Sequence, residues 1–465
     1  MKNLMIKKED LKRFLLFISS SMLILFIVAA FYFIWSENYT ENPFYQRGDY
    51  LIAAVYGIIA IIFIKMYDGF EIGYLKMPDI IFSQSLGILG ADILLYLITC
   101  LVLKDIAPIL PIVKLIIVDV AIIVAWTLVC DYLYIKVFKP KKLLIVYAYH
   151  NATDLITKMI ERPDQYDICE AVNINEGSKT IREKIQKYEG VIICDIHGSQ
   201  RNDLLKYCYS QNKRVYITPK ISDILVRHMQ PIHLIDTPLF IYRNQDLTLE
   251  ERVLKRVFDI VFSLIAIILT FPLMICVAIA IKVHDKVPVF YFQDRVTKNG
   301  KIFKIYKFRS MIVDAERFED KKAEENDERI TPVGRIIRRL RIDEFPQFFN
   351  ILKGDMSFVG PRPERVSNTK EYEKTLPEFE LRLRVKAGLT GYAQVHSNYN
   401  TSAYDKLRLD IFYITNYSFL TDFKILLLTI KVLFNKKSTE GFIPIEETDA
   451  KIEADGDLFT LDDEK

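Results

Sequence analysis

Four long apolar runs fill the first third of the chain, separated by short segments that carry charged residues. They cover residues 14–35, 50–66, 80–103 and 109–134. Each run reaches or approaches the roughly 20 residues that an α-helix needs to cross the hydrocarbon core of a bilayer. The pattern predicts an α-helical N-terminal bundle of four transmembrane helices over residues 1–138.

Basic residues lie at both ends of this bundle, whereas the loop at residues 36–49 carries one arginine beside several acids. Lysine and arginine accumulate on the cytoplasmic side of membrane proteins. We therefore expect both ends of the bundle, and the chain from residue 140 onwards, to face the cytoplasm. The first run is too long for a cleaved signal peptide. The flanking basic residues are Lys2, Lys7, Lys8, Lys12, Arg13, Lys136, Lys139, Lys141 and Lys142.

A fifth apolar run covers residues 260–283 and has basic residues on both of its sides. Pro272 lies near its middle, where a proline removes a backbone hydrogen bond and kinks a helix. We interpret this run as a re-entrant membrane helix that enters one leaflet, breaks at Pro272 and returns. A kinked helix that crosses the bilayer is the alternative.

Between the membrane segments, residues 139–246 alternate short apolar strands with predicted helices. The strands are expected at residues 143–146, 191–194 and 215–218. This alternation predicts an α/β Rossmann-like domain with a small parallel sheet. A dinucleotide site needs a glycine-rich turn after the first strand, yet no glycine occurs from residue 91 to 176. We therefore expect a regulatory domain or one that forms a homodimer.

After residue 287, two strand-like runs flank an Asn299-Gly300 step, which is a strong signal for a β-hairpin. Alternation along the second run, residues 302–308, places Lys307 and Arg309 on one face. A lysine two residues from an arginine on a mostly apolar face suits a bound diphosphate. A surface hairpin with solvated cations is the alternative.

Two further segments carry side chains that can do chemistry. Asp343 and Glu344 precede Pro346, and proline is tolerated in the first turn of a helix, so we expect the carboxylates at a helix N-terminus. That position stabilises anions, and an ionised aspartate can attack phosphorus while its neighbour holds Mg²⁺. A plain helix cap is the alternative. Farther on, two prolines flank Arg362 and restrict its backbone.

Composition narrows the possible classes of protein. Hydrophobic residues make up 51% of the 465 residues and charged residues 26%, which indicates lipid-soluble segments joined to polar domains. A net charge of +3 gives no signature of nucleic-acid binding, and the six cysteines lack the spacing of a metal site. Residues 441–465 are rich in acids and predict a disordered tail.

Six segments follow one another within residues 250–440: Gln293-Asp294-Arg295, Lys307-Phe308-Arg309-Ser310-Met311, Arg329-Ile330-Thr331-Pro332-Val333-Gly334-Arg335, Asp343-Glu344-Phe345-Pro346-Gln347, Lys353-Gly354-Asp355-Met356-Ser357-Phe358-Val359-Gly360-Pro361-Arg362-Pro363-Glu364 and Gly388-Leu389-Thr390-Gly391-Tyr392-Ala393-Gln394-Val395. In this order they resemble the bacterial sugar transferase family, the monotopic polyprenyl-phosphate phosphoglycosyl transferases. The chain is similar to the larger members, in which four helices and a degenerate nucleotide-binding-like domain precede an α+β catalytic domain, here residues 247–440.

This resemblance implies a two-step reaction. Asp343 attacks the β-phosphate of a UDP-sugar, UMP leaves, and undecaprenyl phosphate accepts the sugar phosphate from the enzyme. The implied cofactor is Mg²⁺, bound by Glu344 and Asp343. The product starts a capsule, exopolysaccharide or other surface glycan at the cytoplasmic face of the inner membrane. The residues implied to contact substrate are Lys307, Arg309, Arg362 and Arg295 at its phosphates, and Gln394 near it.

The chain departs from the family pattern at three positions. Thr297 replaces a usual glycine, Ala387 replaces a usual proline, and Phe271 replaces a serine that small members carry before the helix-breaking proline. None of these changes removes a charged catalytic group. Phe271 leaves the hydrogen bonding around the predicted break unexplained.

Two other functions are open on the sequence alone. A membrane-bound nucleotide-sugar dehydratase can share this layout but needs the missing glycine-rich turn. A membrane scaffold or sensor descended from such an enzyme has no need of the charged groups that this chain retains. Nothing in the sequence distinguishes glucose, galactose or an N-acetylated sugar in the donor.

Overall fold

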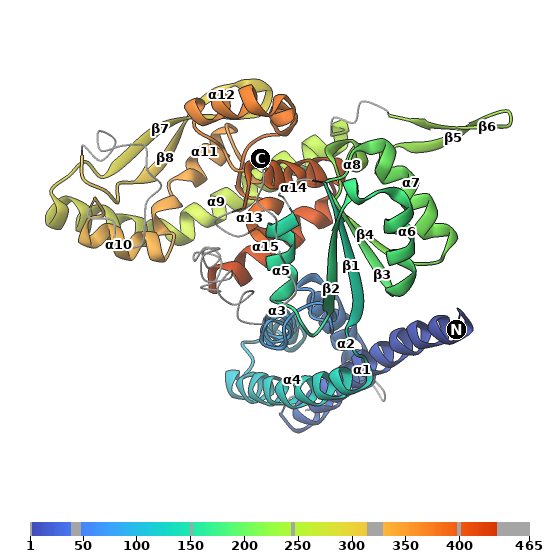
Figure 1. The fold of residues 1–465 in the computed structure, drawn as a ribbon. Coiled ribbons are helices and arrows are strands. Elements are labelled where there is room, and N and C mark those ends of the chain that lie inside the picture. Colours follow the sequence, from blue (N-terminus) through green and yellow to red (C-terminus); the bar gives the residue numbers. More distant parts are fainter. Residues whose placement is uncertain are drawn as a thin grey trace. The chain divides into compact units, whose positions relative to one another are not determined.

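The computed structural model describes residues 2–38, 48–148, 152–242, 247–313, 329–397 and 401–434. The chain divides into two compact units, Met1–Thr218 and Pro219–Phe442, whose elements are labelled in Figure 1. The expected tail at residues 441–465 lies outside the described residues. The domain boundaries expected after residues 138, 246 and 440 stay predictions.

Four long apolar helices open the first unit, as the hydrophobic pattern predicts. Each is long and apolar enough to cross a membrane, and a fifth candidate span, Leu249–Asp285, belongs to the second unit. These spans identify a membrane-bound protein. The four helices are α1 (Lys2–Asn38), α2 (Gly48–Met66), α3 (Met77–Leu103) and α4 (Ile109–Val137).

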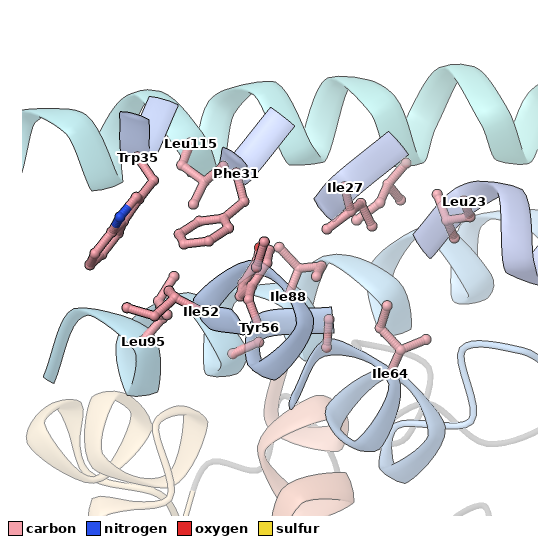
Figure 2. Close-up of a cluster of buried hydrophobic side chains, with 14 of the residues drawn as sticks. Leu23, Ile27, Phe31, Trp35, Ile52, Tyr56, Ile64, Ile88, Leu95 and Leu115 are labelled. Carbon is pink, nitrogen blue, oxygen red and sulfur yellow. The ribbon is translucent and has the colours of Figure 1, made fainter. Parts of the chain in front are cut away.

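The four helices pack around a core of large apolar side chains (Figure 2). Within it, the rings of Phe31 on α1 and Tyr56 on α2 have centroids 4.6 Å apart. Large apolar side chains also cover outer faces, where Leu101 and Ile117 are largely exposed. Water would drive such surfaces to associate, whereas a bilayer solvates them.

The two ends of the bundle meet on one side. Lys12, near the start of α1, lies 5.9 Å from the ring centroid of Tyr74 in the loop between α2 and α3. Its ammonium also donates to the hydroxyl of Tyr134, near the end of α4. These contacts fit an up-and-down bundle, in which the start of α1 and the end of α4 lie on the same side. The charge pattern predicts the same arrangement.

A polar cluster lies inside this apolar bundle. The Tyr56 hydroxyl oxygen is 2.7 Å from Asp92 Oδ1 and 2.8 Å from Asp119 Oδ2, and both aspartates are fully buried. A hydroxyl has a single hydrogen to donate, so the second contact requires a protonated carboxyl that donates to the hydroxyl oxygen. At least one proton therefore belongs to the carboxyl pair. The cluster ties α2, α3 and α4 together.

A four-stranded parallel sheet follows the bundle, in the order β2-β1-β3-β4. Leu144 and Val146 of β1 face one apolar core, and Leu143 and Ile145 face another. A strand that is buried on both faces reads as an unbroken apolar run. The predicted parallel α/β domain is confirmed. Its elements are β1 (Lys141–Tyr147), α5 (Ala152–Ile160), β2 (Tyr166–Asn173), α6 (Ser178–Lys187), β3 (Gly190–Cys194), α7 (Gly198–Ser210) and β4 (Arg214–Ile217).

The sheet and the bundle share a polar contact within the first unit. Arg162, after α5, donates to the carbonyls of Tyr74 and Leu75, and Gln165 donates to the carbonyl of Gly73. These three carbonyls belong to the loop between α2 and α3. The loop therefore lies on the same side of the bundle as the sheet.

The fifth apolar helix, α9 (Leu249–Ala280), continues through Pro272 and ends in a π-helical turn, η2 (Ile281–Asp285). The predicted break at Pro272 thus leaves no gap in the secondary structure. Just before it, the Thr270 hydroxyl donates to the carbonyl of Ala266 at 2.6 Å, a contact that often accompanies helix bending. Thr270 therefore supplies a hydroxyl beside the proline where Phe271 offers none.

Polar contacts fix the start of α9 to the rest of the second unit. Arg256 donates to the carbonyls of Ile351 and Leu352 at the end of α11 (Gln347–Lys353). Asp259 Oδ1 accepts hydrogen bonds from the Ser357 hydroxyl and the Phe358 N–H of β9 (Ser357–Val359), both at 3.0 Å. The membrane helix is thereby joined rigidly to the segments described next.

Two strands in this unit form the predicted hairpin. β7 (Phe290–Val296) and β8 (Ile302–Phe308) pair antiparallel, and Asn299 and Gly300 in their turn have positive φ angles of 58° and 72°. The remaining elements are α8 (Ile221–Arg227), β5 (Gln230–Leu234), β6 (Thr237–Ile241), α10 (Pro332–Arg339), η4 (Ile342–Glu344), α11 (Gln347–Lys353), β9 (Ser357–Val359), α12 (Val366–Thr375), η5 (Pro377–Arg384), β10 (Gly388–Thr390), α13 (Tyr392–His396), α14 (Ala403–Thr415) and α15 (Phe419–Phe434).

Removing the bridging hydroxyl should destabilise the bundle. Tyr56→Phe leaves two buried carboxyls without their common partner, and we expect a loss of about 1–3 kcal/mol. Asp119→Asn should cost less, because its amide can donate to the Tyr56 hydroxyl as a protonated carboxyl does. Thermal unfolding in detergent measures both, with Ser21→Ala at an exposed position of α1 as the control. Equal unfolding midpoints for Tyr56→Phe and Ser21→Ala would contradict the bridge.

Candidate active site

Asp343 and Glu344 lie in the 3₁₀ turn η4, between α10 and α11. Arg341, just before the turn, has a left-handed backbone with φ of 54°, which redirects the chain after α10. The sequence predicted that the two carboxylates lie in the first turn of a helix, but they precede α11. The prediction assumed that Pro346 lies within that turn, whereas α11 begins after it.

Two cations from separate segments hold Glu344. Lys307 Nζ of β8 lies 3.0 Å from Glu344 Oε1, and a guanidinium nitrogen of Arg362 lies 3.4 Å from the same oxygen. The Glu344 side chain is only 14% exposed, so water screens these contacts weakly. Burial raises the pKa of Glu344, but Lys307, Arg362 and Arg341 outweigh it and hold the pKa well below its usual range. This carboxylate is ionised at neutral pH.

Asp343 has a different environment. Its carboxylate makes no hydrogen bond or ion pair with any residue in the part of the chain that the structure describes. Burial raises the pKa of Asp343 above the usual aspartate range, although the charge of Lys307 opposes the shift. Of the two neighbours, Asp343 is therefore the carboxylate that is free to react.

Arg295 adds a second guanidinium beside Arg362. It donates to the carbonyl of Pro363 at 3.1 Å and to Gln293 Oε1 at 2.6 Å. Burial, together with the charge of Arg362, lowers the pKa of Arg295 to about 10. Two like charges held close together favour an anion that offsets their repulsion. The structure thus brings Lys307 and Arg362 to Glu344, and Arg295 to Arg362.

Arg309 does not join this cluster. It donates to the carbonyl of Pro288 at 3.1 Å and lies over the ring of Tyr291. Its backbone N–H still pairs with the carbonyl of Val289 at 2.8 Å, and Tyr291 is the residue paired with Lys307 across the hairpin. Arg309 therefore lies on the face of the hairpin that carries Lys307, as alternation predicts, but its described partners are backbone carbonyls and a ring. Its predicted contact with a phosphate has no support from this geometry.

Gln394 lies on α13, in a segment that approaches the turn carrying Arg362. Its amide donates to the carbonyl of Leu389 at 3.2 Å, and its buried Oε1 has no partner among the described residues. It makes no described contact with Asp343 or Glu344. Its predicted place near the substrate stays a prediction.

Close backbone contacts fix the direction of Arg362. The N–H of Gly360 donates to the carbonyl of Thr390, and the N–H of Gly388 donates to the carbonyl of Pro361, each at 2.9 Å. A Cβ on Gly388 would lie 2.1 Å from the Gly360 nitrogen, so the segments can approach this closely only with glycine. The arginine is thus presented from a rigid turn.

Two supporting residues were not predicted. Asn350 on α11 is fully buried, accepts a hydrogen bond from the Tyr306 N–H at 2.9 Å and donates to the carbonyl of Lys304 at 2.8 Å. It therefore fixes β8, and with it Lys307, against α11. Arg382 donates to the carbonyl of Arg362 at 3.0 Å. The sequence could have indicated Asn350 in one way, because its amide stands alone within an otherwise apolar run.

Two departures from the family pattern are hydrogen-bonded to each other. The N–H of Ala387 donates to Thr297 Oγ1, and the Thr297 hydroxyl donates to the carbonyl of Asp355, both at 3.1 Å. Proline at position 387 has no N–H and therefore needs no acceptor from position 297. Alanine adds a buried N–H, and the threonine accepts from it. The second departure compensates for the first.

The two carboxylates fit a Mg²⁺ ion that is shared with substrate. Mg²⁺ is commonly held by one or two carboxylates, with phosphate oxygens and water completing its shell. Among the described residues Asp343 has no hydrogen-bond or ion-pair partner, and both cations bind Oε1 of Glu344, so oxygens on both carboxylates remain available there. Within the described ranges, no group of three or more His, Cys, Asp and Glu side chains could hold a metal without substrate.

The model of the bacterial sugar transferase family matches residues 250–436. A protein of Bacillus subtilis (strain 168), provisionally assigned as an undecaprenyl-phosphate N-acetylgalactosaminyl 1-phosphate transferase, is 48% identical over 130 residues, which cover 28% of this chain and 73% of that protein. The chain belongs to the bacterial sugar transferase family. All the site residues described above lie within the matched range, so the cluster belongs to the family's shared part.

Longer relatives match between about two fifths and half of this family member. The UDP-N-acetylgalactosamine-undecaprenyl-phosphate N-acetylgalactosaminephosphotransferase of Aeromonas hydrophila is 43% identical over 39% of this chain. The UDP-glucose:undecaprenyl-phosphate glucose-1-phosphate transferase of Escherichia coli (strain K12) is 33% identical over 52% of it. The matches span 43% and 53% of these relatives, which is about half their length.

Thr297→Gly should destabilise the second unit, because it leaves the buried N–H of Ala387 without an acceptor. We expect a loss of about 1–3 kcal/mol. Adding Ala387→Pro to Thr297→Gly removes that N–H and should restore part of the loss. Thermal unfolding of the two single variants and the double variant measures this coupling. Strictly additive effects would show that the two positions do not compensate.

Proposed function

We propose that this protein transfers a sugar 1-phosphate from a UDP-sugar to undecaprenyl phosphate and releases UMP. The observation that carries the proposal is the contrast between two adjacent carboxylates: Asp343 has no partner in the part of the chain that the structure describes, whereas Lys307 and Arg362 hold Glu344. A free carboxylate beside cations suits phosphoryl transfer through a covalent intermediate. The names of the relatives support the same class of reaction.

In the first step, an oxygen of Asp343 attacks the β-phosphorus of the donor and forms an acyl phosphate. The bond from that phosphorus to the oxygen bridging the two phosphates breaks, and UMP leaves with the oxygen and its electron pair. Lys307 and Arg362 bind the phosphate oxygens and stabilise the charge that develops on the leaving group. Arg295 adds positive charge behind Arg362.

In the second step, an oxygen of undecaprenyl phosphate attacks the same phosphorus, and the Asp343 carboxylate leaves. The aspartate is regenerated and the sugar phosphate is joined to the lipid through a diphosphate. Mg²⁺ held by Glu344 and Asp343 would neutralise phosphate charge. The product is suited to start a capsule, exopolysaccharide or another surface glycan.

The contacts of α9 support a re-entrant arrangement. Phe258 near its start and Ile267 near its middle pack in one apolar core of the second unit, and Met274 and Ile281 near its end pack on Phe308 in another. A straight helix of 32 residues is about 48 Å long, more than the thickness of a bilayer's hydrocarbon core. A helix whose start, middle and end all contact one domain lies along that domain. We place both ends of α9 on the cytoplasmic side of the inner membrane.

The relatives differ in the sugar that they are named for, which is N-acetylgalactosamine, glucose or galactose. The proposal therefore covers UDP-sugars as a class. The sheet of the first unit has no assigned chemistry, and we propose that it regulates the enzyme or forms a homodimer.

Asp343→Asn should abolish release of UMP, because a neutral amide cannot attack phosphorus. A panel of UDP-sugars is offered to purified protein with Mg²⁺ and undecaprenyl phosphate, and released UMP is measured. Glu373→Gln, at an exposed position of α12, is the control and should turn over normally. Because burial raises the pKa of Asp343, activity should fall with acidity at a higher pH than an exposed aspartate would give. Full turnover by Asp343→Asn would exclude this nucleophile.

Cysteine labelling tests the path of α9. His284→Cys in η2 and Glu37→Cys near the end of α1 are made in a background without native cysteines, and intact cells receive an impermeant maleimide. Both positions are exposed in the structure. We expect labelling at position 37 and none at position 284 until the cells are opened. Labelling of both positions in intact cells would show that α9 crosses the membrane.

A further inference from the structure

Gln347, the first residue of α11, carries a buried amide that the site described above does not use. The residue is 3% exposed, and its Nε2 has no hydrogen-bond partner among the described residues. A buried donor without an acceptor costs stability, and such groups in folded proteins call for an explanation. A methionine or leucine would fill the same volume without that cost.

Its position along the chain places the amide beside the carboxylate pair. Glu344, Gln347 and Asn350 follow each other at intervals of three residues, a spacing that puts side chains on one face of helical turns. Glu344 contacts Lys307 of β8, and Asn350 binds the backbone of β8 at Tyr306. Gln347 therefore lies on the side of α11 that faces β8, one turn from Glu344.

The contacts of Glu344 change when an anion binds. In the structure, its two cation partners both bind Oε1, at 3.0 Å from Lys307 and 3.4 Å from Arg362. Oε2 makes no hydrogen bond within the described part of the chain. A donor diphosphate would compete for both cations, because phosphate oxygens are strong acceptors for lysine and arginine. Glu344 would then lose both of these ion pairs, and with them the contacts that fix its orientation in a largely buried site.

We propose that Gln347 is a positioning residue: its free amide N–H donates to the Glu344 carboxylate once Lys307 and Arg362 turn from Glu344 to the phosphates of the donor. This inference rests on the proposed function. The hydrogen bond replaces two lost ion pairs, and it keeps Glu344 correctly oriented during transfer. While the two cations hold Glu344 in its present orientation, the Gln347 amide has no partner among the described residues.

The charged groups that face Glu344 come from three segments. Lys307 lies on β8, Arg362 on the turn after β9, and Arg341 and Asp343 on the chain around η4. In the substrate complex Lys307 and Arg362 bind phosphate, so the hydrogen bond from Gln347 is the contact that keeps the Glu344 carboxylate in place.

The test compares two amides one turn apart. Gln347→Met removes the unpaired donor at nearly constant volume, and Asn350→Leu removes an amide that is fully bonded. In full-length protein held in lipid nanodiscs, the unfolding midpoint of Gln347→Met should equal or exceed that of the unsubstituted protein. The midpoint of Asn350→Leu should fall, because the N–H of Tyr306 and the carbonyl of Lys304 lose their partner.

Single-turnover release of UMP, without acceptor lipid, then measures the proposed role. Gln347→Met should slow the maximal rate by about 10-fold to 100-fold, the loss expected for one hydrogen bond to a charged group. The donor concentration for half-maximal rate should change little, since Gln347 touches Glu344 and not the donor. Gln347→Glu, which places a second carboxylate there, should be slower still.

Three outcomes would count against the inference, and they are distinguishable. An unchanged maximal rate in Gln347→Met would exclude the positioning role while leaving the proposed function intact. A fall in its unfolding midpoint together with its rate would assign Gln347 to the structure alone. Absence of UMP release by the unsubstituted protein with every UDP-sugar would overturn the proposed function, and this inference with it.

Discussion

The site depends on one interaction, the buried ion pair between Lys307 and Glu344. A carboxylate that is 14% exposed would take up a proton if it lacked a cation, because burial disfavours its charged form. Lys307 and Arg362 reverse that preference, so two cations reach a single acceptor from segments far apart in the chain. The fold around them keeps β8, η4 and the turn after β9 in register. Asp343, one residue away, has no such partner.

Several buried polar side chains hold these segments in place. Asn350 joins α11 to β8, Asp259 joins α9 to β9, and Arg256 joins α9 to the end of α11. Each of these hydrogen bonds is made to a backbone group. It therefore fixes the path of the segment and does not depend on the side chain at that position. The membrane helix is therefore part of the framework of the site. A change in the position of α9 in the lipid would therefore alter the positions of the two carboxylates.

The elements that the sequence predicted well are those with a strong local signal. Four apolar runs gave α1 to α4, the apolar run at Leu143–Val146 gave β1, and the Asn299-Gly300 step gave the hairpin. β2 (Tyr166–Asn173) was missed because it lies at the edge of the sheet and is only half-buried, so its pattern is mixed. The edge strand owes its place to pairing with β1, which no local pattern records.

Within the site, the sequence identified residue types better than their partners. Lys307 and Arg362 were expected at the same ligand and do meet at one carboxylate. Strand alternation correctly placed Arg309 on the face of the hairpin that carries Lys307, but its guanidinium binds the carbonyl of Pro288 instead of joining the cluster at Glu344. Alternation predicts the face on which a side chain lies, whereas its partner depends on tertiary packing.

The unpaired amide of Gln347 shows a further limit of local reasoning. The sequence alone does not show that Gln347 is buried, and its burial alone does not show that its amide lacks a partner among the described residues. Both facts emerge only when α11 packs on β8 and Glu344 is already held by two cations. A protein that keeps such a donor sacrifices stability in its resting state. This loss of stability has an explanation if Glu344 becomes available to Gln347 only during the reaction. The site must then accommodate the cations on Glu344 before the substrate binds and on the phosphates afterwards.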